Sequence, residues 1–339
     1  MPELRDLTTL RLGGPAGLLV TATTEAELVE AVSTADAAGE PVLVLGGGSN
    51  LVVADEGFPG VVVRVATRGV TPDAEDDASC GGVLVKVAAG ESWDELVATA
   101  VARGWVGVEA LSGIPGAVGA TPIQNVGAYG QEVAQTIASV RVWDRTLRGV
   151  RTFANADCGF GYRHSRFKAD PGRHVVLDVT FQLAQGPLSA PVRYAELART
   201  LGIEEGARAP LAEVREAVLG LRRGKGMVLD AADHDTWSAG SFFTNPVVAP
   251  EAVPAGAPSW PADGGVKTSA AWLIQHAGFD KGHGNARVAL SGKHPLALTN
   301  RGGATTAELL DLAREVRDGV AAAYGITLVN EPVLVGCEL

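Results

Sequence analysis

Two stretches of the chain concentrate glycine and could bind an anion through the main chain. The first reads LGGGSN at residues 45–50, and the second reads LSGIPGAVGATPIQNVGAYG at 111–130. Because glycine has no Cβ, successive amides can face one concavity and approach a phosphate at van der Waals distance. Three adjacent glycines weaken a connection between strands, since glycine loses the most conformational entropy on folding. Both stretches are therefore candidates for a pyrophosphate-binding loop.

Neither stretch matches the usual nucleotide-binding glycine motifs. A GxGxxG that opens a helix and a GxxxxGK[ST] loop are both missing from them. Short glycine motifs also occur by chance, so a pair of tight turns remains the alternative interpretation of the first stretch.

Five motifs in one order along the chain resemble the UDP-N-acetylenolpyruvoylglucosamine reductase (MurB) family. They are GGGSNLVVADEGFPG at 46–60, GIPGAVGATPIQNVGAYG at 113–130, CGFGYRHSRFK at 158–168, AGSFFTNP at 239–246 and NEPVLVG at 330–336. The resemblance covers essentially the whole chain, and five ordered motifs are more specific than one glycine loop. It implies an α+β fold, with an FAD-binding domain of the vanillyl-alcohol oxidase (PCMH) type and a C-terminal α+β substrate-binding domain.

The resemblance also implies where the domains begin and end. The FAD-binding domain consists of two α+β subdomains, and the second is followed by the substrate-binding domain. The implied bounds are 1–68 for the first subdomain, to which the C-terminal strand 327–339 returns, 69–215 for the second, and 216–326 for the substrate-binding domain.

By resemblance, the first glycine stretch holds the FAD pyrophosphate and the second lines the adenine and the isoalloxazine. The implied cofactor-binding residues are Gly46, Gly47, Gly48, Ser49, Asn50, Leu51, Gly113, Ile114, Pro115, Gly116, Gly119, Thr121, Pro122, Asn125 and Gly127. Some relatives attach the flavin covalently through a His or a Cys in these loops. Neither residue type occurs in them here, so we expect a dissociable FAD.

The implied reaction passes hydride from NADPH to FAD and then from the flavin N5 to an enolpyruvyl double bond, producing UDP-N-acetylmuramic acid. Hydride arrival at the β-carbon leaves negative charge on the α-carbon and the carboxylate, which the enzyme must stabilise before it protonates carbon. By resemblance, Arg163 forks onto the carboxylate, Glu331 polarises it, and Ser241 donates the proton. The alternatives are an Arg163 paired with a surface acid, a Ser241 that caps a turn, and a Glu331 that flanks a strand.

Four more residues match the family's substrate-binding positions, and they are Tyr129, Tyr194, Lys225 and Asn245. Tyr194, in PVRYAEL, matches the tyrosine on the mobile loop of one of the family's two subclasses and implies that subclass. Lys225 and Asn245 match residues that hold the UDP pyrophosphate and neighbouring groups. A Tyr194 that packs its own loop is the alternative.

Charge bounds the kinds of partner. The formal net charge of -11 argues against a general nucleic-acid binder, which would present a basic face. A small anionic ligand would instead need a local group of cations. The run 281–294 contains Lys281, His283, Arg287, Lys293 and His294 without an acid, and it is either such a group or a solvated loop.

Helices and strands that must position these residues are visible in local patterns. Capping boxes predict helices that begin after Thr24, Ser92 and Thr305, the last of which ends at Gly325. A fourth helix is expected after Pro210. Apolar β-branched runs predict strands at 18–22, 41–45, 60–65, 82–90 and 175–183. The segment 249–265, rich in proline, alanine and glycine, is expected to be a surface loop.

The remaining sequence signals indicate a cytoplasmic protein. The N-terminal residues lack a secretory pattern, and no apolar run approaches the ~20 residues of a membrane helix. Cys80, Cys158 and Cys337 are far apart and are expected to be reduced structural thiols, and the histidines are scattered, so no metal site is expected. The expected partners are a UDP-sugar and NADPH, with no nucleic acid and no membrane insertion, and the chain is expected to be a monomer.

Two other functions compete with the reductase. An oxidase or dehydrogenase of a sugar alcohol or lactone would share both glycine stretches but would have no reason to contain AGSFF and NEP together. A non-catalytic nucleotide-binding protein could retain the scaffold, because fold alone does not establish activity. The presence of Arg163, Ser241 and Glu331 argues against loss of activity.

Overall fold

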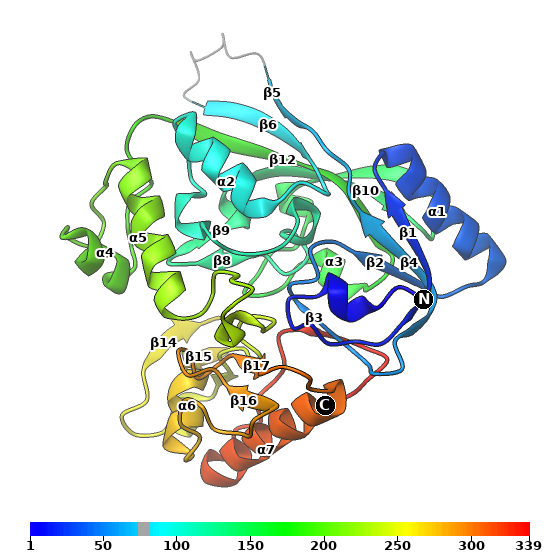
Figure 1. Ribbon diagram of the computed structural model, residues 1–339. Helices are drawn as coiled ribbons and strands as arrows, with labels where there is room; N and C mark the ends of the chain where they lie inside the picture. The colour runs from blue at the N-terminus through cyan, green and yellow to red at the C-terminus, as the bar shows by residue number, and fades with distance from the viewer. Residues whose placement is uncertain (74–81) are drawn as a thin grey trace. The chain divides into compact units, whose positions relative to one another are not determined.

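The computed structural model describes residues 1–73 and 82–339 (Figure 1). Helices contain 29% and strands 28% of the residues, so the α+β class expected from the sequence is confirmed. The chain divides into two compact units. Unit 1 comprises residues 1–16, 48–58 and 224–339, and unit 2 comprises residues 17–47 and 59–223. The three-domain division implied by the sequence stays a prediction.

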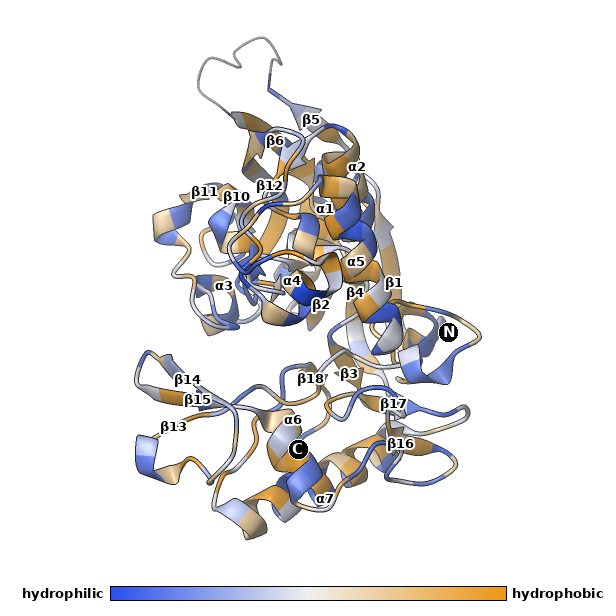
Figure 2. Cartoon of the chain, turned by 90° about the vertical axis from the view of Figure 1, so that its left-hand side faces the viewer, coloured by the Kyte–Doolittle hydropathy of each residue, from blue (hydrophilic) through white to orange (hydrophobic). Residues whose placement is uncertain are grey.

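A six-stranded sheet forms the centre of unit 2. The strands run in the order β11, β10, β12, β6 and β5, with β7 also paired to β12, and all these pairings are antiparallel. Their bounds are Val70–Pro72 (β5), Gly82–Ala88 (β6), Trp105–Val106 (β7), Ile137–Asp144 (β10), Gly149–Ala154 (β11) and His174–Gln185 (β12). Hydrophobic residues lie along β12 (Figure 2), and most residues of this strand are buried.

A smaller sheet in unit 2 has the order β1, β4, β2. Its strands are Ala16–Ala22 (β1), Val42–Leu45 (β2) and Phe58–Val65 (β4). Helix α1 (Glu25–Ala38) begins at Thr24, where both hydrogen bonds of the predicted capping box form, and buries Leu28 and Val32. Strand β2 pairs in parallel with β4. The carboxyl end of β2 leads directly into the first glycine stretch.

Helix α2 (Trp93–Ala102) begins after Ser92, as the sequence predicts, and the Ser92 side chain accepts from the Glu95 amide. Trp93 is fully buried, and its indole Nε1 donates to the Leu111 carbonyl at 3.1 Å. Burial of this ring and its hydrogen bond together fix α2 against the start of the second glycine stretch.

Residues 187–224, which include Tyr194, form an excursion from the large sheet. It contains α4 (Ala195–Leu201) and α5 (Leu211–Gly224), which begins after Pro210 as predicted. Backbone hydrogen bonds from Ser189 to Ala209 and from Leu211 to Pro187 close its base. Its apolar side chains pack together with Ala110 in a small separate core.

Unit 1 is built around helix α7 (Thr306–Tyr324). Both bonds of the capping box at Thr305 form, and the helix ends at Gly325 with φ 68°, as the sequence predicts. The other elements of the unit are β3 (Leu51–Val53), β13 (Val247–Val248), β14 (Ser259–Ala262), β15 (Gly265–Thr268), α6 (Ala270–His276), β16 (Val288–Leu290), β17 (Leu298–Asn300) and β18 (Val333–Val335). The C-terminal strand β18 pairs in parallel with β3.

The sequence predicts a surface loop at 249–265, and this prediction is wrong for residues 259–262 and 265, which belong to strands. Strands β14 and β15 form an antiparallel hairpin in which Ala262 pairs with Gly265. Asp263 and Gly264 make the two-residue turn, and Gly264 has φ 82°. The turn needs a residue that takes positive φ at its second position, and glycine does so without a steric cost.

Gly319 in α7 is expected to resist substitution even though it lies inside a helix. A Cβ at this position would lie 2.4 Å from ring carbons Cε2 and Cζ of Phe279. Gly319→Ala should therefore lower stability by about 1–3 kcal/mol through overpacking. Gly220→Ala in α5, where a Cβ would meet no atom within 4 Å, should raise stability by about 0.5–1 kcal/mol.

Thermal unfolding of both variants under the same buffer conditions checks this contrast. The midpoint should fall for Gly319→Ala and rise for Gly220→Ala. If Gly319→Ala proved as stable as the parent chain, the described packing of Phe279 on α7 would be wrong.

Candidate active site

The two glycine stretches meet in unit 2. A Cβ on Gly47 would lie 2.6 Å from the Cα of Gly116, and a Cβ on Gly46 would lie 3.3 Å from the Cβ of Ala117. Real Cβ atoms do not approach a neighbouring backbone this closely, so the contact requires a bare Gly47. The turn after β2 and the second stretch therefore form one surface made largely of main chain.

Packing also explains the third glycine of the first stretch. A Cβ on Gly48 would lie 1.9 Å from the Leu7 carbonyl oxygen, and Gly48 has φ 60°. Gly48, Ser49, Asn50 and Leu51 belong to unit 1. Since Gly48 is needed for folding of unit 1, its presence alone does not indicate a ligand.

Residues 116–119 of the second stretch are held by hydrogen bonds to the segment that joins β6 to α2 and to the first residue of α2. The amides of Trp93 and Val118 donate to the carbonyls of Gly116 and Glu91, and the amide of Gly119 donates to that of Ala89. A Cβ on Gly119 would lie 2.5 Å from the Cβ of Ala89. These hydrogen bonds fix the course of the main chain from Gly116 to Gly119.

Asp94 connects α2 with both the second glycine stretch and α5. Its Oδ1 accepts from the Gly113 amide at 2.6 Å, and its carboxylate binds Arg215 with contacts of 2.7 and 3.0 Å. Burial by itself would raise the pKa of Asp94, but the hydrogen bonds from Arg215 and Gly113 hold this pKa below its ordinary value. Asp94 is therefore an ionised anchor for Gly113.

Arg163 lies beside the end of the second stretch. It sits in a tight turn closed by two hydrogen bonds between Gly161 and His164. Its guanidinium Nη2 donates to the carbonyl of Gly127 at 3.0 Å, and its own carbonyl accepts from Lys168 Nζ at 3.1 Å. Unit 2 thus brings the predicted catalytic arginine to β8 (Gly127–Ala128), the last part of the predicted flavin-lining stretch.

Strained backbone is concentrated in the same region. Among the described residues, positive φ outside glycine occurs at Arg11, Asn125, Tyr129, Arg148 and Arg163. Three of these, Asn125 (48°), Tyr129 (49°) and Arg163 (51°), are predicted site residues. Residues in this region of φ cost about 1–3 kcal/mol and persist where the surroundings hold them, which is common at functional sites.

The side chain of Asn125 is used by the protein itself. Its Nδ2 donates to Gly161 O at 3.0 Å and to Glu132 Oε2 at 2.8 Å, and its Oδ1 accepts from the Ala134 amide at 3.1 Å. Asn125 therefore links the second stretch, β9 (Gln131–Glu132) and the turn of Arg163. The contact between Asn125 and the cofactor that the sequence predicts would therefore be made by the main chain of Asn125.

Tyr129 and Tyr194 come together in unit 2, although the sequence does not link them. Their ring centroids lie 5.4 Å apart with an interplanar angle of 88°, an edge-to-face contact. Tyr194 precedes α4 and remains 43% exposed. Two predicted substrate-binding residues thus form one aromatic pair with an open side.

Arg222, on α5, is a residue that sequence analysis missed. Burial lowers its pKa to about 10, while the nearby Tyr129 and Asp94 act in the opposite direction. A guanidinium with this pKa still carries its charge at neutral pH. The seven-residue spacing from Arg215 places both arginines on one face of α5, and this spacing was a signal that could have identified Arg222.

Ser241 and Glu331 come together in unit 1. The amide of Glu331 donates to the carbonyl of Phe242 at 2.8 Å, and Phe243 forms a β-bridge with Asn330. The amide of Val333 donates to Asn50 O at 2.9 Å. Two predicted catalytic residues thus lie on neighbouring backbone segments, next to the end of the predicted pyrophosphate loop.

Lys225 and Asn245 also belong to unit 1, and both are half-buried. The Oδ1 of Asn245 accepts from the Ala270 amide at 2.9 Å, at the first residue of α6. The amide nitrogen Nδ2 of Asn245 is the part of this side chain that can donate to a ligand. The structure therefore gives Asn245 a capping task besides its predicted role.

The cationic run 281–294 is largely neutralised by carboxylates from other parts of unit 1. Arg287 binds Glu308 at 2.8 Å, His283 lies 2.9 Å from Glu315, and Lys293 binds Asp233. A local surplus of positive charge is the feature that would attract an anion, and these pairs remove most of it.

Thiols and metal ligands give no further site. Cys158 and Cys337 are free, burial raises the pKa of Cys158 to about 11, and Cys80 lies outside the described residues. A thiol with so high a pKa is unreactive at neutral pH. Within residues 1–73 and 82–339, no group of three or more His, Cys, Asp or Glu could hold a metal ion. No helix in the same ranges is long and apolar enough to cross a membrane.

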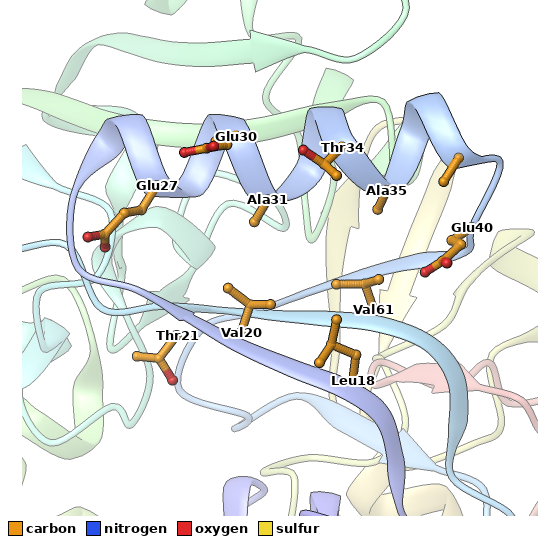
Figure 3. Close-up of a pocket in the computed structure, with 11 residues that line it drawn as sticks. Leu18, Val20, Thr21, Glu27, Glu30, Ala31, Thr34, Ala35, Glu40 and Val61 are labelled. Atoms are coloured by element: carbon orange, nitrogen blue, oxygen red, sulfur yellow. The ribbon is translucent and has the colours of Figure 1, made fainter.

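A hollow of about 550 Å³ lies between α1 and strands β1 and β4 (Figure 3). Its wall is apolar at Leu18 and Val61, whereas Glu27, Glu30 and Glu40 add carboxylates. No predicted site residue lines it. Because carboxylates repel a phosphate, this hollow is not a candidate for the pyrophosphate.

Comparison with known proteins identifies the family. The model of an FAD binding domain matches residues 16–149, and that of the UDP-N-acetylenolpyruvoylglucosamine reductase C-terminal domain matches residues 232–335. The UDP-N-acetylenolpyruvoylglucosamine reductase of Cutibacterium acnes is 60% identical over 99% of this chain and 90% of that protein. The chain belongs to the UDP-N-acetylenolpyruvoylglucosamine reductase family.

Other members of the UDP-N-acetylenolpyruvoylglucosamine reductase family agree. The protein of Streptomyces avermitilis is 57% identical over 99% of this chain and 94% of its own length. The crystal structure of the Thermus caldophilus enzyme has a TM-score of 0.69 and 28% identity, and it covers 98% of this chain and 97% of that one. The resemblance inferred from five sequence motifs is thereby confirmed.

Membership of the UDP-N-acetylenolpyruvoylglucosamine reductase family makes the chain an FAD-dependent oxidoreductase. The matched FAD-binding segment contains Gly46, Gly47 and the second stretch through Gly127. The close approach of Gly47 to Gly116 fits a pyrophosphate cradle, because an added Cβ would separate the two loops. The roles of individual residues and the tyrosine-loop subclass remain predictions.

Proposed function

We propose that the chain uses NADPH to reduce the enolpyruvyl group of UDP-N-acetylglucosamine enolpyruvate to UDP-N-acetylmuramate, a step of cytoplasmic peptidoglycan precursor synthesis. The observation that carries the proposal is the hydrogen bond of Arg163 to Gly127, which holds a cation at the end of the predicted flavin-lining stretch. The names of relatives at 57–60% identity over 99% of the chain supply the substrate.

The main chain of Gly46, Gly47 and the 113–127 stretch would hold a dissociable FAD. When bound, this FAD would supply the hydride for reduction of the enolpyruvyl β-carbon, with NADPH as the reductant. Arg163 offers a planar pair of N–H donors to the substrate carboxylate. Its task is to stabilise the negative charge that the carboxylate gains as hydride arrives.

Glu331 and Ser241 complete the proposed chemistry. Glu331 shares a proton with the substrate carboxylate and so polarises it. The Ser241 hydroxyl gives its proton to the α-carbon. A serine hydroxyl is a weak acid, so this transfer depends on the strongly basic carbon that the reduction creates beside it.

Binding of the nucleotide part falls to other residues. Tyr129 and Tyr194 present their aromatic pair to the substrate, as in the tyrosine-loop subclass. Lys225 and Asn245 hold the UDP pyrophosphate and neighbouring groups. Arg222 adds positive charge beside Tyr129, which favours an anionic ligand at this pair.

NADPH and the UDP-sugar both carry a pyrophosphate, so one pocket would serve them in turn and the kinetics would be ping-pong. The partners would be these small molecules, with a monomeric chain and no nucleic acid. Equal slopes in double-reciprocal plots at several NADPH concentrations would support this order.

Steady-state oxidation of NADPH by the FAD-loaded chain tests the proposal. NADPH should be consumed when UDP-N-acetylglucosamine enolpyruvate is added, with one UDP-N-acetylmuramate formed per NADPH. An alcohol oxidase would instead consume oxygen with an alcohol and would need no NADPH. A non-catalytic nucleotide-binding protein would bind the nucleotides without turnover.

A further inference from the structure

Glu109 is a fully buried carboxylate that the proposed chemistry does not use. It lies just before the second glycine stretch and has no exposed surface. Its Oε2 accepts from the Gly107 amide at 2.7 Å, and its Oε1 accepts from the Ala190 amide at 2.7 Å and from Gln131 Nε2 at 3.0 Å. One carboxylate therefore joins its own segment to two others, which lie 22 and 81 residues further along the chain.

Two of these segments carry the aromatic pair. Gln131 follows Tyr129 by two residues, and Ala190 precedes Tyr194 by four. The side chain of Gln131 is itself fixed, because its Oε1 accepts from the Ala110 amide at 2.8 Å. Glu109 thus sets the spacing between the backbone that leads from Tyr129 and the backbone that leads to Tyr194.

The excursion that carries Tyr194 is held together internally by backbone hydrogen bonds. The Val192 amide donates to Ala207 and the Gly206 amide donates to Val192, while the Ser189–Ala209 and Leu211–Pro187 bonds close its base. The contact of Arg215 with Asp94 anchors α5, whereas the segment before Tyr194 is bonded outside the excursion through the Ala190 amide and Glu109. The apolar core of the excursion meets Ala110, the residue after Glu109. The hydrogen bond at Ala190 therefore acts close to the point where the excursion turns toward Tyr129.

We propose that Glu109 is the positioning residue of the Tyr129–Tyr194 pair and that, through this pair, it sets the affinity for the UDP-sugar without touching the reacting atoms. The part of this inference that concerns affinity rests on the proposed function. The part that concerns the order of the excursion stands on the contacts of Glu109 alone.

Glu109→Gln tests the inference with little change of shape. A glutamine amide offers one acceptor atom where the carboxylate offers two, so its NH2 group must face at least one of the N–H donors. A buried N–H donor that loses its acceptor is strongly unfavourable. The Ala190 amide can recover a hydrogen bond if its segment moves away from residue 109 into solvent. We expect the KM for UDP-N-acetylglucosamine enolpyruvate to rise about tenfold while kcat stays within about threefold.

The matched control is Glu205→Gln, which makes the same chemical change at an exposed position of the same excursion. It should leave KM, kcat and FAD content as in the parent chain. Hydrogen exchange over residues 190–201, measured on the FAD-loaded chain without substrate, should be about tenfold faster in Glu109→Gln and unchanged in Glu205→Gln.

Each part of the inference can fail separately. Unchanged exchange over 190–201 in Glu109→Gln would overturn it whatever the activity of the chain. Faster exchange with an unchanged KM would overturn the link to affinity, whereas a parent chain without substrate-dependent NADPH oxidation would refute the proposed function and leave the exchange result standing.

A second variant covers the case in which Glu109→Gln does not fold. Gln131→Met introduces an apolar side chain of similar length at a buried site, and it removes both the donor to Glu109 and the acceptor for the Ala110 amide. It should raise KM in the same direction, by about threefold, with kcat and FAD content unchanged. An unchanged KM in Gln131→Met together with a non-folding Glu109→Gln would leave Glu109 a purely structural residue and overturn the proposal.

Discussion

Replacing Ser241 by alanine is expected to slow oxidation of the reduced flavin by UDP-N-acetylglucosamine enolpyruvate by about 10²–10⁴-fold, the usual contribution of a positioned proton donor. Reduction of the flavin by NADPH should stay nearly unchanged, because no proton is delivered to carbon in that half-reaction. Stopped-flow absorbance of the flavin separates the two half-reactions.

The fold around Ser241 makes this substitution a clean test. The neighbouring contacts are made by main chain, with the Glu331 amide donating to the Phe242 carbonyl at 2.8 Å, and alanine preserves them. Ser259→Ala, at an exposed position of β14, is the matched control and should leave both half-reactions unchanged. Equal slowing of both half-reactions in Ser241→Ala would contradict the proposed role of the hydroxyl.

Gly47→Ala should weaken FAD binding by at least about tenfold. Its Cβ would lie 2.6 Å from the Cα of Gly116, so the two glycine stretches must separate by a large fraction of an ångström or more. Backbone amides bind a pyrophosphate well only at a fixed distance, and a loss of about 1.4 kcal/mol is tenfold in affinity. Quenching of flavin fluorescence during titration of the apoprotein measures the effect.

Gly186→Ala is the control for Gly47→Ala. It lies in the same unit, and its Cβ would meet no atom within 4 Å. Far-UV circular dichroism should show both variants folded. Parent-like FAD affinity in Gly47→Ala would show that the described approach of the two stretches does not hold the cofactor. Gly48→Ala is a poorer test, because a clash of 1.9 Å with Leu7 O would damage the fold itself.

The parts of the fold that the sequence predicted are those set by neighbouring residues. The capping boxes at Thr24 and Thr305 depend on side chains three residues apart, and both form. Strands with clear alternation, such as β6, appear where they were expected. The β14–β15 hairpin was missed because the proline, alanine and glycine content of 249–265 is typical of a loop.

The parts that could not be predicted depend on contacts between distant segments. The hydrogen bond from Ala190 to Glu109 spans 81 residues, and no local sequence pattern near either residue predicts it. The sequence also could not distinguish glycines needed for packing from glycines needed for a ligand. Gly47 and Gly48 both require bare backbone against protein atoms, which a motif alone does not reveal.

The candidate site was predicted through motifs, and the structure adds how its residues are held. Arg163 is fixed at Gly127, and Ser241 lies beside the segment of Glu331. Each pair therefore joins residues to which the sequence assigns related roles. The cationic run 281–294, left open by the sequence, is paired with carboxylates that come from other segments. Glu109 was missed because its importance follows from burial and from partners in distant segments, whereas the spacing of Arg222 from Arg215 was a local signal that was overlooked.

The visible absorption spectrum of the purified chain, recorded alone, after NADPH and then after UDP-N-acetylglucosamine enolpyruvate under exclusion of oxygen, tests the central claim most directly. A yellow protein should lose its flavin absorbance with NADPH and regain it with the enolpyruvyl sugar. A colourless chain that takes up no FAD, or a bleached flavin that the sugar does not reoxidise, would contradict the account.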